Sequence, residues 1–384
     1  MGALRDFVAE VLEIEGAAVE PMEPDALEVL APVPLRGIMG WPDLVRLGFG
    51  AELPAGAIPV GLEGDWLDRF GTLLGERGRW AERQVALPLT PPGDPARLLE
   101  RALDLPNAVW RLHGVAERWT RCLLLTFRYT AVSDEKREGL IWLAFNQGTG
   151  AVIDDVATRL RALLAEDAEW RAPDPDVRRA AGSGWEPAAL TARVPPLLKH
   201  HVQSEMEVFL RAMRRRLDRD CNRVHDYHHD LRVASVRRLA AVSGTTGEKA
   251  EADRKREMLR IAAIEREYAA KLEDLRHNYA LRVTVEWVQG LELFVPVWRH
   301  EVVIKRRKGE RLVSLDWHSA VRLMEAPPCD WGLGLMRTRL VCDDNLHLTD
   351  PAGQTPCPSC GKPWCRACHP TACPRCEKAV EAAP

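Results

Sequence analysis

Residues 357–376 read CPSCGKPWCRACHPTACPRC, and the spacing of these six cysteines decides how the end of the chain folds. They form three C-x-x-C pairs with four residues between successive pairs, and a looser C-x4-H pair lies upstream. A C-x-x-C pair places two thiolates on one tight turn, and four such ligands suit tetrahedral zinc. The pattern therefore predicts a zinc-binding module over residues 329–378. Its candidate ligands are Cys342, His347, Cys357, Cys360, Cys365, Cys368, Cys373 and Cys376.

The spacing leaves the pairing of these ligands open. Eight ligands in four pairs suit two ions, in a cross-braced arrangement in which pairs one and three bind the same ion. The alternative is a single ion on Cys357, Cys360, Cys373 and Cys376, with the middle pair free or partnered by His369. A redox C-x-x-C belongs in a βαβ unit, and iron–sulfur proteins use other spacings. Because ligands are abundant, we expect one or two closed, structural Zn²⁺ sites.

The distribution of cysteines also indicates metal rather than disulfides. Eight of the ten cysteines lie at or after Cys329, and only Cys122 and Cys221 lie before it. A disulfide-stapled secreted domain would spread its cysteines through a small fold. No apolar run is long enough to span a bilayer, and the first residues are acidic and amphipathic rather than a secretion signal. We therefore expect a cytoplasmic protein with no membrane partner.

The fold class predicted for the whole chain is α+β. Residues 1–166 read as a mixed α and β domain, with paired short strands at 17–33, a strand and a helix capped by Asp65 at 57–78, a hairpin at 121–146 and a helix within 148–166. Residues 167–197 are rich in Pro, Gly and Ala and predict a linker.

Residues 198–282 change to a helical period. Val202, Met206, Phe209 and Met213 begin one apolar stripe, and a second stripe runs from Ile261 to Tyr279 after a glycine-containing break at 243–249. Two striped helices around one short break predict an antiparallel helical hairpin, a coiled-coil-like arm about 60 Å long if the first helix has about 40 residues. Residues 283–320 then read as a β segment whose hairpin turn includes Lys308 and Gly309.

Basic residues provide a candidate nucleic-acid surface. Residues 199–282 carry 19 Lys and Arg against 14 Asp and Glu, a net charge of +5, which leaves −8 on the remainder of the chain, whose total is −3. A basic arm can lie along phosphates, although charged helices are usually only solvated. The candidate contacts are Arg211, Arg214, Arg215, Arg216, Arg219, Arg223, Lys305, Arg306, Arg307 and Lys308. Cys221, His225 and His229 on the same helix are read as a solvated polar stretch rather than a metal site.

Motifs for catalysis are missing from the sequence. The stretch NQGTG at 146–150 is read as a turn, and there is no phosphate-binding loop, G-x-S-x-G elbow or H-E-x-x-H pair. The sequence therefore predicts a protein that is not an enzyme. A metal-dependent or nucleic-acid-modifying enzyme in the N-terminal half is kept as the third hypothesis.

The stretch EREYAAKLEDLRHNYALRVTVEWVQGLEL at 265–293 is a charged helix that leads directly into a strand. It resembles the C-terminal, non-motor region of RapA-type bacterial Swi/Snf ATPases, which bind RNA polymerase. The order of parts over residues 55–290 is also similar, including AIPVGLEGDWLDRF at 57–70 and RCLLLTFRYTAV at 121–132. The motor lobes are absent, and the cysteine cluster is not part of that region. No catalytic residue carries over.

This resemblance implies an accessory region that exists as its own chain and carries an added zinc tail. The leading hypothesis is a non-enzymatic adaptor of a Swi/Snf-type helicase or translocase, or of RNA polymerase. The alternative is direct DNA or RNA binding through the basic arm and the zinc module.

Overall fold

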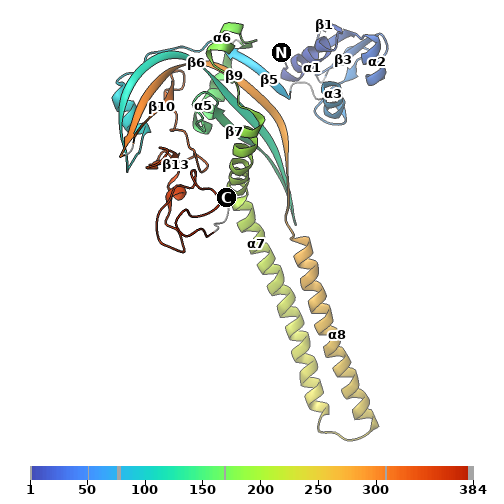
Figure 1. Ribbon diagram of the computed structural model, residues 1–384. Coiled ribbons are helices and arrows are strands. Elements are labelled where there is room, and N and C mark those ends of the chain that lie inside the picture. Colours follow the sequence, from blue (N-terminus) through green and yellow to red (C-terminus); the bar gives the residue numbers. More distant parts are fainter. Residues whose placement is uncertain (1, 51, 76–78, 168–169, 308, 379–384) are drawn as a thin grey trace. The chain divides into compact units, whose positions relative to one another are not determined.

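The computed structural model describes residues 2–50, 52–75, 79–167, 170–307 and 309–378, and it divides the chain into two compact units, residues 1–80 and 81–384 (Figure 1). Helices and sheets occur in both units, so the predicted α+β class is confirmed. No helix in the described ranges combines the length and the apolar character needed to cross a membrane.

The first unit is a small sheet covered by helices. Its elements are α1 (Ala3–Ile14), β1 (Ala18–Met22), β2 (Ala26–Leu30), α2 (Val33–Met39), β3 (Leu44–Gly48), β4 (Ile58–Pro59) and α3 (Trp66–Leu74). The strand order is β1-β2-β3-β4, antiparallel except for the β3–β4 pair. The predicted pairing of β1 with β2 is confirmed, as is α3, which buries Phe70 and Leu73. Asp65 does not cap α3, because its carboxylate instead accepts a hydrogen bond from Arg69.

The second unit is built on a seven-stranded sheet, with a long helical hairpin and the cysteine-rich module. Its elements are β5 (Trp80–Val85), α4 (Pro95–Ala102), β6 (Val109–Val132), β7 (Lys136–Asn146), α5 (Asp154–Asp167), β8 (Trp170–Arg171), α6 (Pro175–Ala180), α7 (Pro187–Val242), α8 (Glu248–Asn278), β9 (Arg282–Arg306), β10 (Gly309–His318), β11 (Leu323–Met324), β12 (Leu340–Val341), β13 (Leu348–Thr349) and the 3₁₀ helix η1 (Pro351–Gln354).

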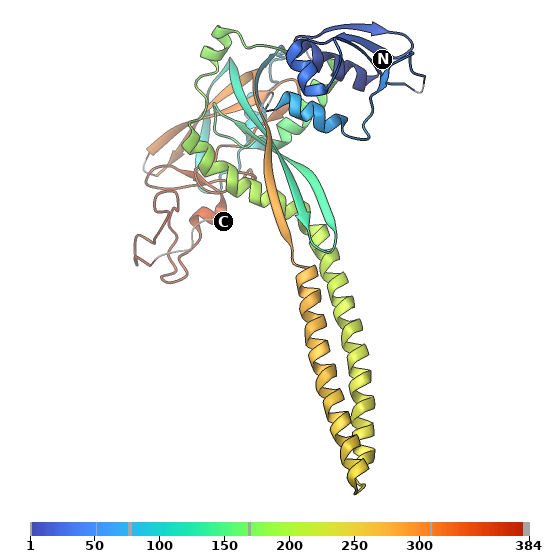
Figure 2. The same cartoon turned by 90° about the vertical axis from the view of Figure 1, so that its right-hand side faces the viewer.

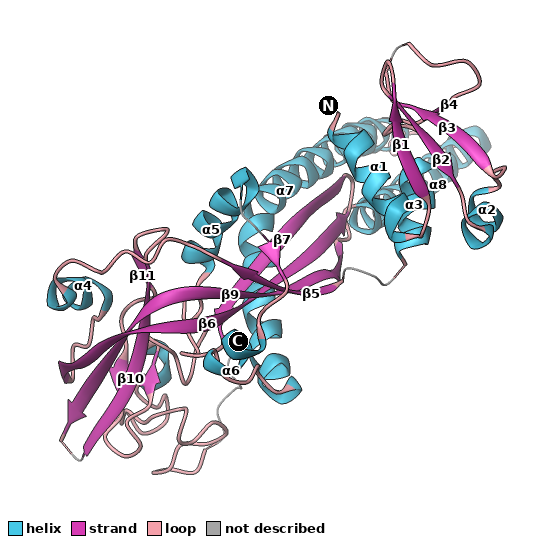
Figure 3. Cartoon of the chain, turned by 90° about the horizontal axis from the view of Figure 1, so that it is seen from above, coloured by secondary structure: helices cyan, strands magenta, loops and turns pink. Residues whose placement is uncertain are grey.

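The antiparallel pair of β6 and β9 is the spine of this sheet (Figure 3). It runs from Val109 opposite Lys305 to Val132 opposite Arg282, with irregularities after Leu112 and after Thr126. β7 pairs with the outer side of β6 as the predicted hairpin, and β10 pairs with β9 as the predicted second hairpin. The turn residue Lys308 lies outside the described ranges.

This pairing corrects the predicted domain boundaries. The sequence pattern placed residues 1–166 in one domain and 283–320 in another, whereas the first unit ends at Trp80 and strands β5 to β11 form one sheet. The predicted linker at 167–197 is also structured: it contains β8, α6 and the start of α7, and Val177 packs on Phe294 of β9. The alternation of apolar and polar residues shows that a segment is a strand, but it does not show which strand pairs with it. The sequence pattern therefore assigned these paired strands to different domains.

The predicted helical hairpin is present, as α7 and α8 lie antiparallel beyond the sheet (Figure 2). Its first stripe has a different role from the one predicted. Met206, Phe209 and Met213 are buried against the β6–β7 hairpin, with Leu123, Leu125 and Phe127 among their neighbours, and only the later part of α7 contacts α8. The second stripe does face α7, with Ile264 only 7% exposed.

Candidate metal centre

The eight predicted ligands come together in two groups of four, and within each group the ligand atoms all lie within 4.8 Å of one another. The histidine-containing group consists of Cys342, His347, Cys365 and Cys368, and the all-cysteine group consists of Cys357, Cys360, Cys373 and Cys376. In chain order, the first pair joins the third and the second joins the fourth. The arrangement is therefore cross-braced, and His369 is in neither group.

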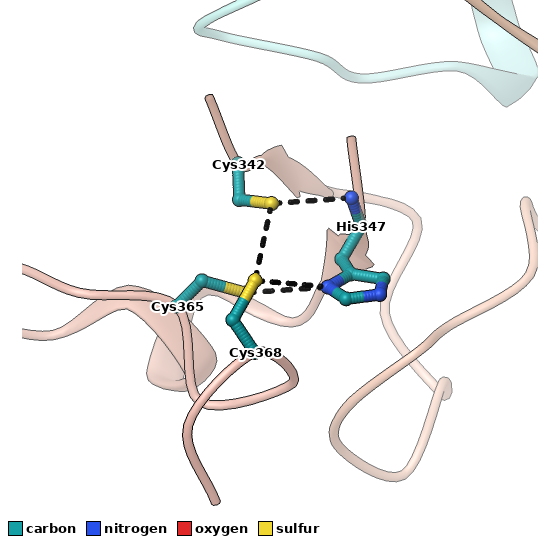
Figure 4. Close-up of side chains that lie close together, drawn as sticks. All are labelled: Cys342, His347, Cys365 and Cys368. Carbon is teal, nitrogen blue, oxygen red and sulfur yellow. Dashed lines mark hydrogen bonds between the residues drawn. The ribbon is translucent and has the colours of Figure 1, made fainter. Parts of the chain in front are cut away.

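In the histidine-containing group, the imidazole Nδ1 of His347 is the atom that faces the sulfurs (Figure 4). It lies 3.3 Å from Sγ of Cys368 and 3.8 Å from Sγ of Cys365. The Sγ atoms of Cys342 and Cys368 are 3.8 Å apart. Asn345 donates a hydrogen bond to Cys368 over 3.4 Å, which supports a thiolate from outside the group.

In the all-cysteine group, two sulfur–sulfur distances connect the two C-x-x-C pairs. Sγ of Cys357 is 3.7 Å from that of Cys376, and Sγ of Cys360 is 3.8 Å from that of Cys373. Sulfurs at about 2.3 Å from a tetrahedral ion lie about 3.8 Å apart, whereas bonded disulfide sulfurs lie about 2.05 Å apart. All ten cysteines are free. The distances therefore fit a tetrahedral metal site and not a disulfide.

Three of the four ligand pairs share one backbone turn. In each, the N–H of the first cysteine donates to the carbonyl five residues on: Cys342 to His347, Cys357 to Lys362 and Cys373 to Lys378. In the same turns Leu346, Gly361 and Glu377 have φ between 55° and 70°. This left-handed residue turns the chain back sharply, so that both ligands of a pair point to one side. The sequence repeat is thus a repeat of one local structure.

The acidity of the cysteines differs within each group. Burial opposes ionisation of Cys357, but hydrogen bonds from the backbone N–H groups of Cys360 and Ser359 bring the pKa of its thiol down to about 6. Burial raises the pKa of Cys365 to about 12. A backbone hydrogen bond favours the thiolate of Cys376, but burial and its hydrogen bonds to the neighbouring cysteines raise its pKa to about 11. Because only thiolates ligate zinc, metal binding must displace protons from the least acidic thiol of each group, Cys365 in one and Cys376 in the other.

One residue that the sequence did not single out holds together the loop that precedes most of the metal ligands. Arg339 is fully buried, and its guanidinium donates to the backbone carbonyls of residues 327, 328, 334, 336 and 338 and to the carboxylate of Asp350. The loop is linked to β10 by the ion pair between Arg311 and Asp330, whose carboxylate also accepts the N–H of Leu348. An isolated arginine carries no spacing signal, so only the structure identifies this role.

The structure gives the predicted basic residues different surroundings. Arg216 pairs with Asp134 and Glu135, and Arg306 pairs with Asp343 and donates to the carbonyl of Asn107, so both are engaged within the fold. Arg211, Arg223 and Lys305 are in exposed ion pairs. Arg214, Arg215, Arg219 and Arg307 are exposed, and none has a carboxylate partner among the residues that the structure describes. Lys308 lies outside those residues.

The histidines of α7 do not form a metal group in the described part of the chain. His225 is hydrogen-bonded to the hydroxyl of Tyr268 on α8 over 3.2 Å, and His228 is buried beside the same ring. They contribute to the contact between the two helices.

Comparison with known proteins adds no family to this description. No protein-family model, no curated protein and no solved structure matches the chain. The metal centre and the helical hairpin are the features of the molecule that bear on its function.

Proposed function

We propose that this chain is an adaptor protein in which each ligand group of the C-terminal module holds one structural Zn²⁺, and in which the α7–α8 hairpin is the arm that contacts a partner. The observation that carries the zinc assignment is the cross-braced geometry, with four ligand atoms at tetrahedral spacing in each group. Sulfur-rich tetrahedral sets favour zinc among the common divalent metals. Four protein ligands leave no position for a substrate, which supports a structural use.

Zinc supplies folding free energy that the module does not obtain from the burial of apolar side chains. The apolar cluster around the all-cysteine group is small and consists of Cys357, Trp364 and Cys373 with two partly buried cysteines. Binding of structural zinc contributes about 10–16 kcal/mol in small modules of this type. The ion pairs of Arg306 with Asp343 and of Arg311 with Asp330 transmit this rigidity to the sheet.

The helical hairpin has the features of a contact arm. Its shorter helix, α8, has 31 residues, which corresponds to about 45 Å at the usual rise of an α-helix. Large apolar side chains are exposed along it, including Tyr227 at 59%, Met258 at 62% and Leu259 at 62%. Exposed apolar side chains on a rigid helical surface favour contact with another protein. On the resemblance to RapA-type proteins, the proposed partner is a Swi/Snf-type ATPase or RNA polymerase.

The test is recovery of partners with the tagged full-length chain from its own host, after nuclease treatment, followed by mass spectrometry. A Swi/Snf-type ATPase or RNA polymerase that is retained supports the adaptor. The paired change Met258→Glu and Leu259→Glu should lower that recovery at least tenfold. Loss of these partners from the unmodified protein after nuclease, or equal recovery with the paired variant, overturns the proposed role of the arm.

Direct binding to DNA or RNA is the second candidate, and one observation favours it. Arg214, Arg215 and Arg219 are exposed on α7 without carboxylate partners in the described part of the chain. If they contact phosphates, changing all three to alanine should weaken binding to duplex DNA and reduce the salt slope by about three. The control triple on α8, Lys255, Arg256 and Arg260 to alanine, removes the same charge. An equal effect of both triples would exclude a specific site on α7.

A further inference from the structure

The outer edge of β7 is open over part of its length. At one end it is closed, because the N–H of Ala144 donates to Asp154 over 2.8 Å and its carbonyl accepts from the N–H of Ile153 over 2.8 Å. Alternate residues of a strand direct their backbone groups to the same side. The N–H and C=O groups of Leu140 and Trp142 therefore face this outer edge, where they have no hydrogen-bond partner among the described residues.

A pocket of about 560 Å³ lies beside this edge and is lined by residues of β6, β7, β9, α5 and α7. Both helices contact β7, and Figure 3 shows them beside that strand. Its lining is mainly apolar and includes Leu124, Leu140, Trp142, Leu143, Val288 and Leu291. The side chains of Leu140 and Trp142 remain 46% and 44% exposed. The volume is within the range of about 300–1,000 Å³ that ligand pockets occupy.

The polar side chains of the pocket favour a cation. Asp154 and Glu205 provide two carboxylates, and Asp154 is hydrogen-bonded to the imidazole of His201 over 2.9 Å. Glu205 is exposed and has no ion pair among the described residues. The guanidinium of Arg161 stacks 3.9 Å from the ring of Trp142, so the one arginine of the lining is held against an aromatic face.

We propose that this edge and pocket bind an extended segment of a partner protein. The segment adds a strand beside Leu140 and Trp142, places apolar side chains in the pocket and sets a lysine or arginine against Glu205. Only an extended backbone presents donors and acceptors at the two-residue repeat, about 6.8 Å, that the open groups require. Such strand addition draws affinity from main-chain hydrogen bonds and specificity from pockets for alternate side chains. The proposal depends on neither the zinc assignment nor the arm.

The experiment uses the full-length, zinc-supplemented protein and a phage-displayed library of random heptapeptides as the probe. We expect enrichment of peptides with alternating apolar residues and one basic residue. An enriched peptide, made synthetically with a fluorophore, should lose at least tenfold in affinity for Leu140→Pro. Proline is tolerated where the N–H of an edge strand faces outward, so this variant blocks strand addition without removing a ladder bond.

Two further variants keep the test decisive if Leu140→Pro folds poorly. Thr158→Trp fills the pocket from the exposed side of α5 and should also abolish peptide binding. Glu205→Lys should shift the selected peptides from basic to acidic, whereas the control Glu207→Lys, exposed on α7 but outside the pocket lining, should leave the selection unchanged. No enriched peptide, or peptides that bind the Leu140→Pro and Thr158→Trp proteins as well as the unmodified one, would overturn the proposal.

Discussion

The cysteine module and the central sheet reach their folds by opposite routes. In the module, the ligands of each pair are at most five residues apart along the chain, and its own apolar cluster has three buried residues. In the sheet, the paired residues of β6 and β9 are at least 150 positions apart in the chain, yet the two strands pair along their whole length and bury Leu293, Val295 and Val297 beneath α5. One region depends on local ligand chemistry and the other on long-range apolar burial. Substitutions or metal removal should therefore affect the stability of one region without affecting that of the other.

Removal of the metal should have the largest effect, and it should be confined to the module. We expect a chelator, or Cys373→Ser, to unfold residues 329–378, because the lost zinc affinity is worth about 10–16 kcal/mol in modules of this type. Hydrogen exchange by mass spectrometry should then show loss of protection there and unchanged protection in β6 and β9. Two zinc ions per chain are expected by elemental analysis, and Cys221→Ser, outside both groups, should leave that number unchanged.

Replacement of Arg339 should destabilise the loop between the sheet and the metal ligands. Arg339→Met leaves the carboxylate of Asp350 and several buried carbonyls without their donor, and we expect a loss of about 3–5 kcal/mol in the free energy of unfolding. Urea denaturation of the zinc-loaded protein measures this loss. The exposed Arg337, two residues away, provides the control: Arg337→Met should change the free energy by less than about 0.5 kcal/mol. An equal loss in both variants would mean that the buried position of the Arg339 guanidinium does not contribute to the free energy of unfolding.

Truncation of the sheet-facing stripe of α7 should affect the sheet and spare the metal. Phe209 is 6% exposed against the β6–β7 hairpin, so Phe209→Ala should cost about 3–5 kcal/mol of unfolding free energy. The neighbouring Val208 is 61% exposed, and Val208→Ala should be close to neutral. Zinc content should remain unchanged in both. A loss of zinc from the Phe209 variant would show that the two regions are coupled more tightly than their contacts indicate.

The smallest expected effect concerns a buried acid in the sheet. Glu325 is fully buried and accepts hydrogen bonds from Asn146 and from the N–H of Asp316; burial, reinforced by the nearby Asp316 carboxylate, raises the pKa of its side chain. The folded state therefore holds this proton more tightly than the unfolded state. The contribution of Glu325 to the free energy of unfolding is fully present below the pKa of this side chain in the unfolded state, which is near 4.5. It declines as the pH rises towards the pKa in the folded state, by at most about 1.4 kcal/mol per pH unit.

Glu325→Gln, which cannot ionise, should remove this decline. The measurement is the free energy of unfolding against pH from 5 upward, compared between the two proteins at constant zinc concentration. The difference between them isolates Glu325 from the pH dependence of metal binding. Parallel curves would show that Glu325 keeps the same pKa in both states.

Local features of this protein were predictable from the sequence. The metal ligands, the β6–β7 and β9–β10 hairpins and the α7–α8 hairpin all depend on residues close in the chain, whose spacing and turn chemistry leave a readable pattern. Even their cross-bracing was one of the arrangements that four pairs allow. The burial of Ile264 along α8 likewise follows from a period that the sequence shows.

Long-range features were decided only by the tertiary structure. The stripe of Met206 and Phe209 predicts a buried helix face but not whether a helix or a sheet covers it, and the Pro-rich segment at 167–197 packs because β9 offers Phe294. The role of Arg339 and the open edge at Leu140 and Trp142 depend on how backbone groups are arranged in space, which residue spacing does not show. Sequence spacing determined which residues could share a turn or a metal ion. Which surfaces meet was settled by the pairing of β6 with β9, because burying both strands required partners that no local pattern specifies.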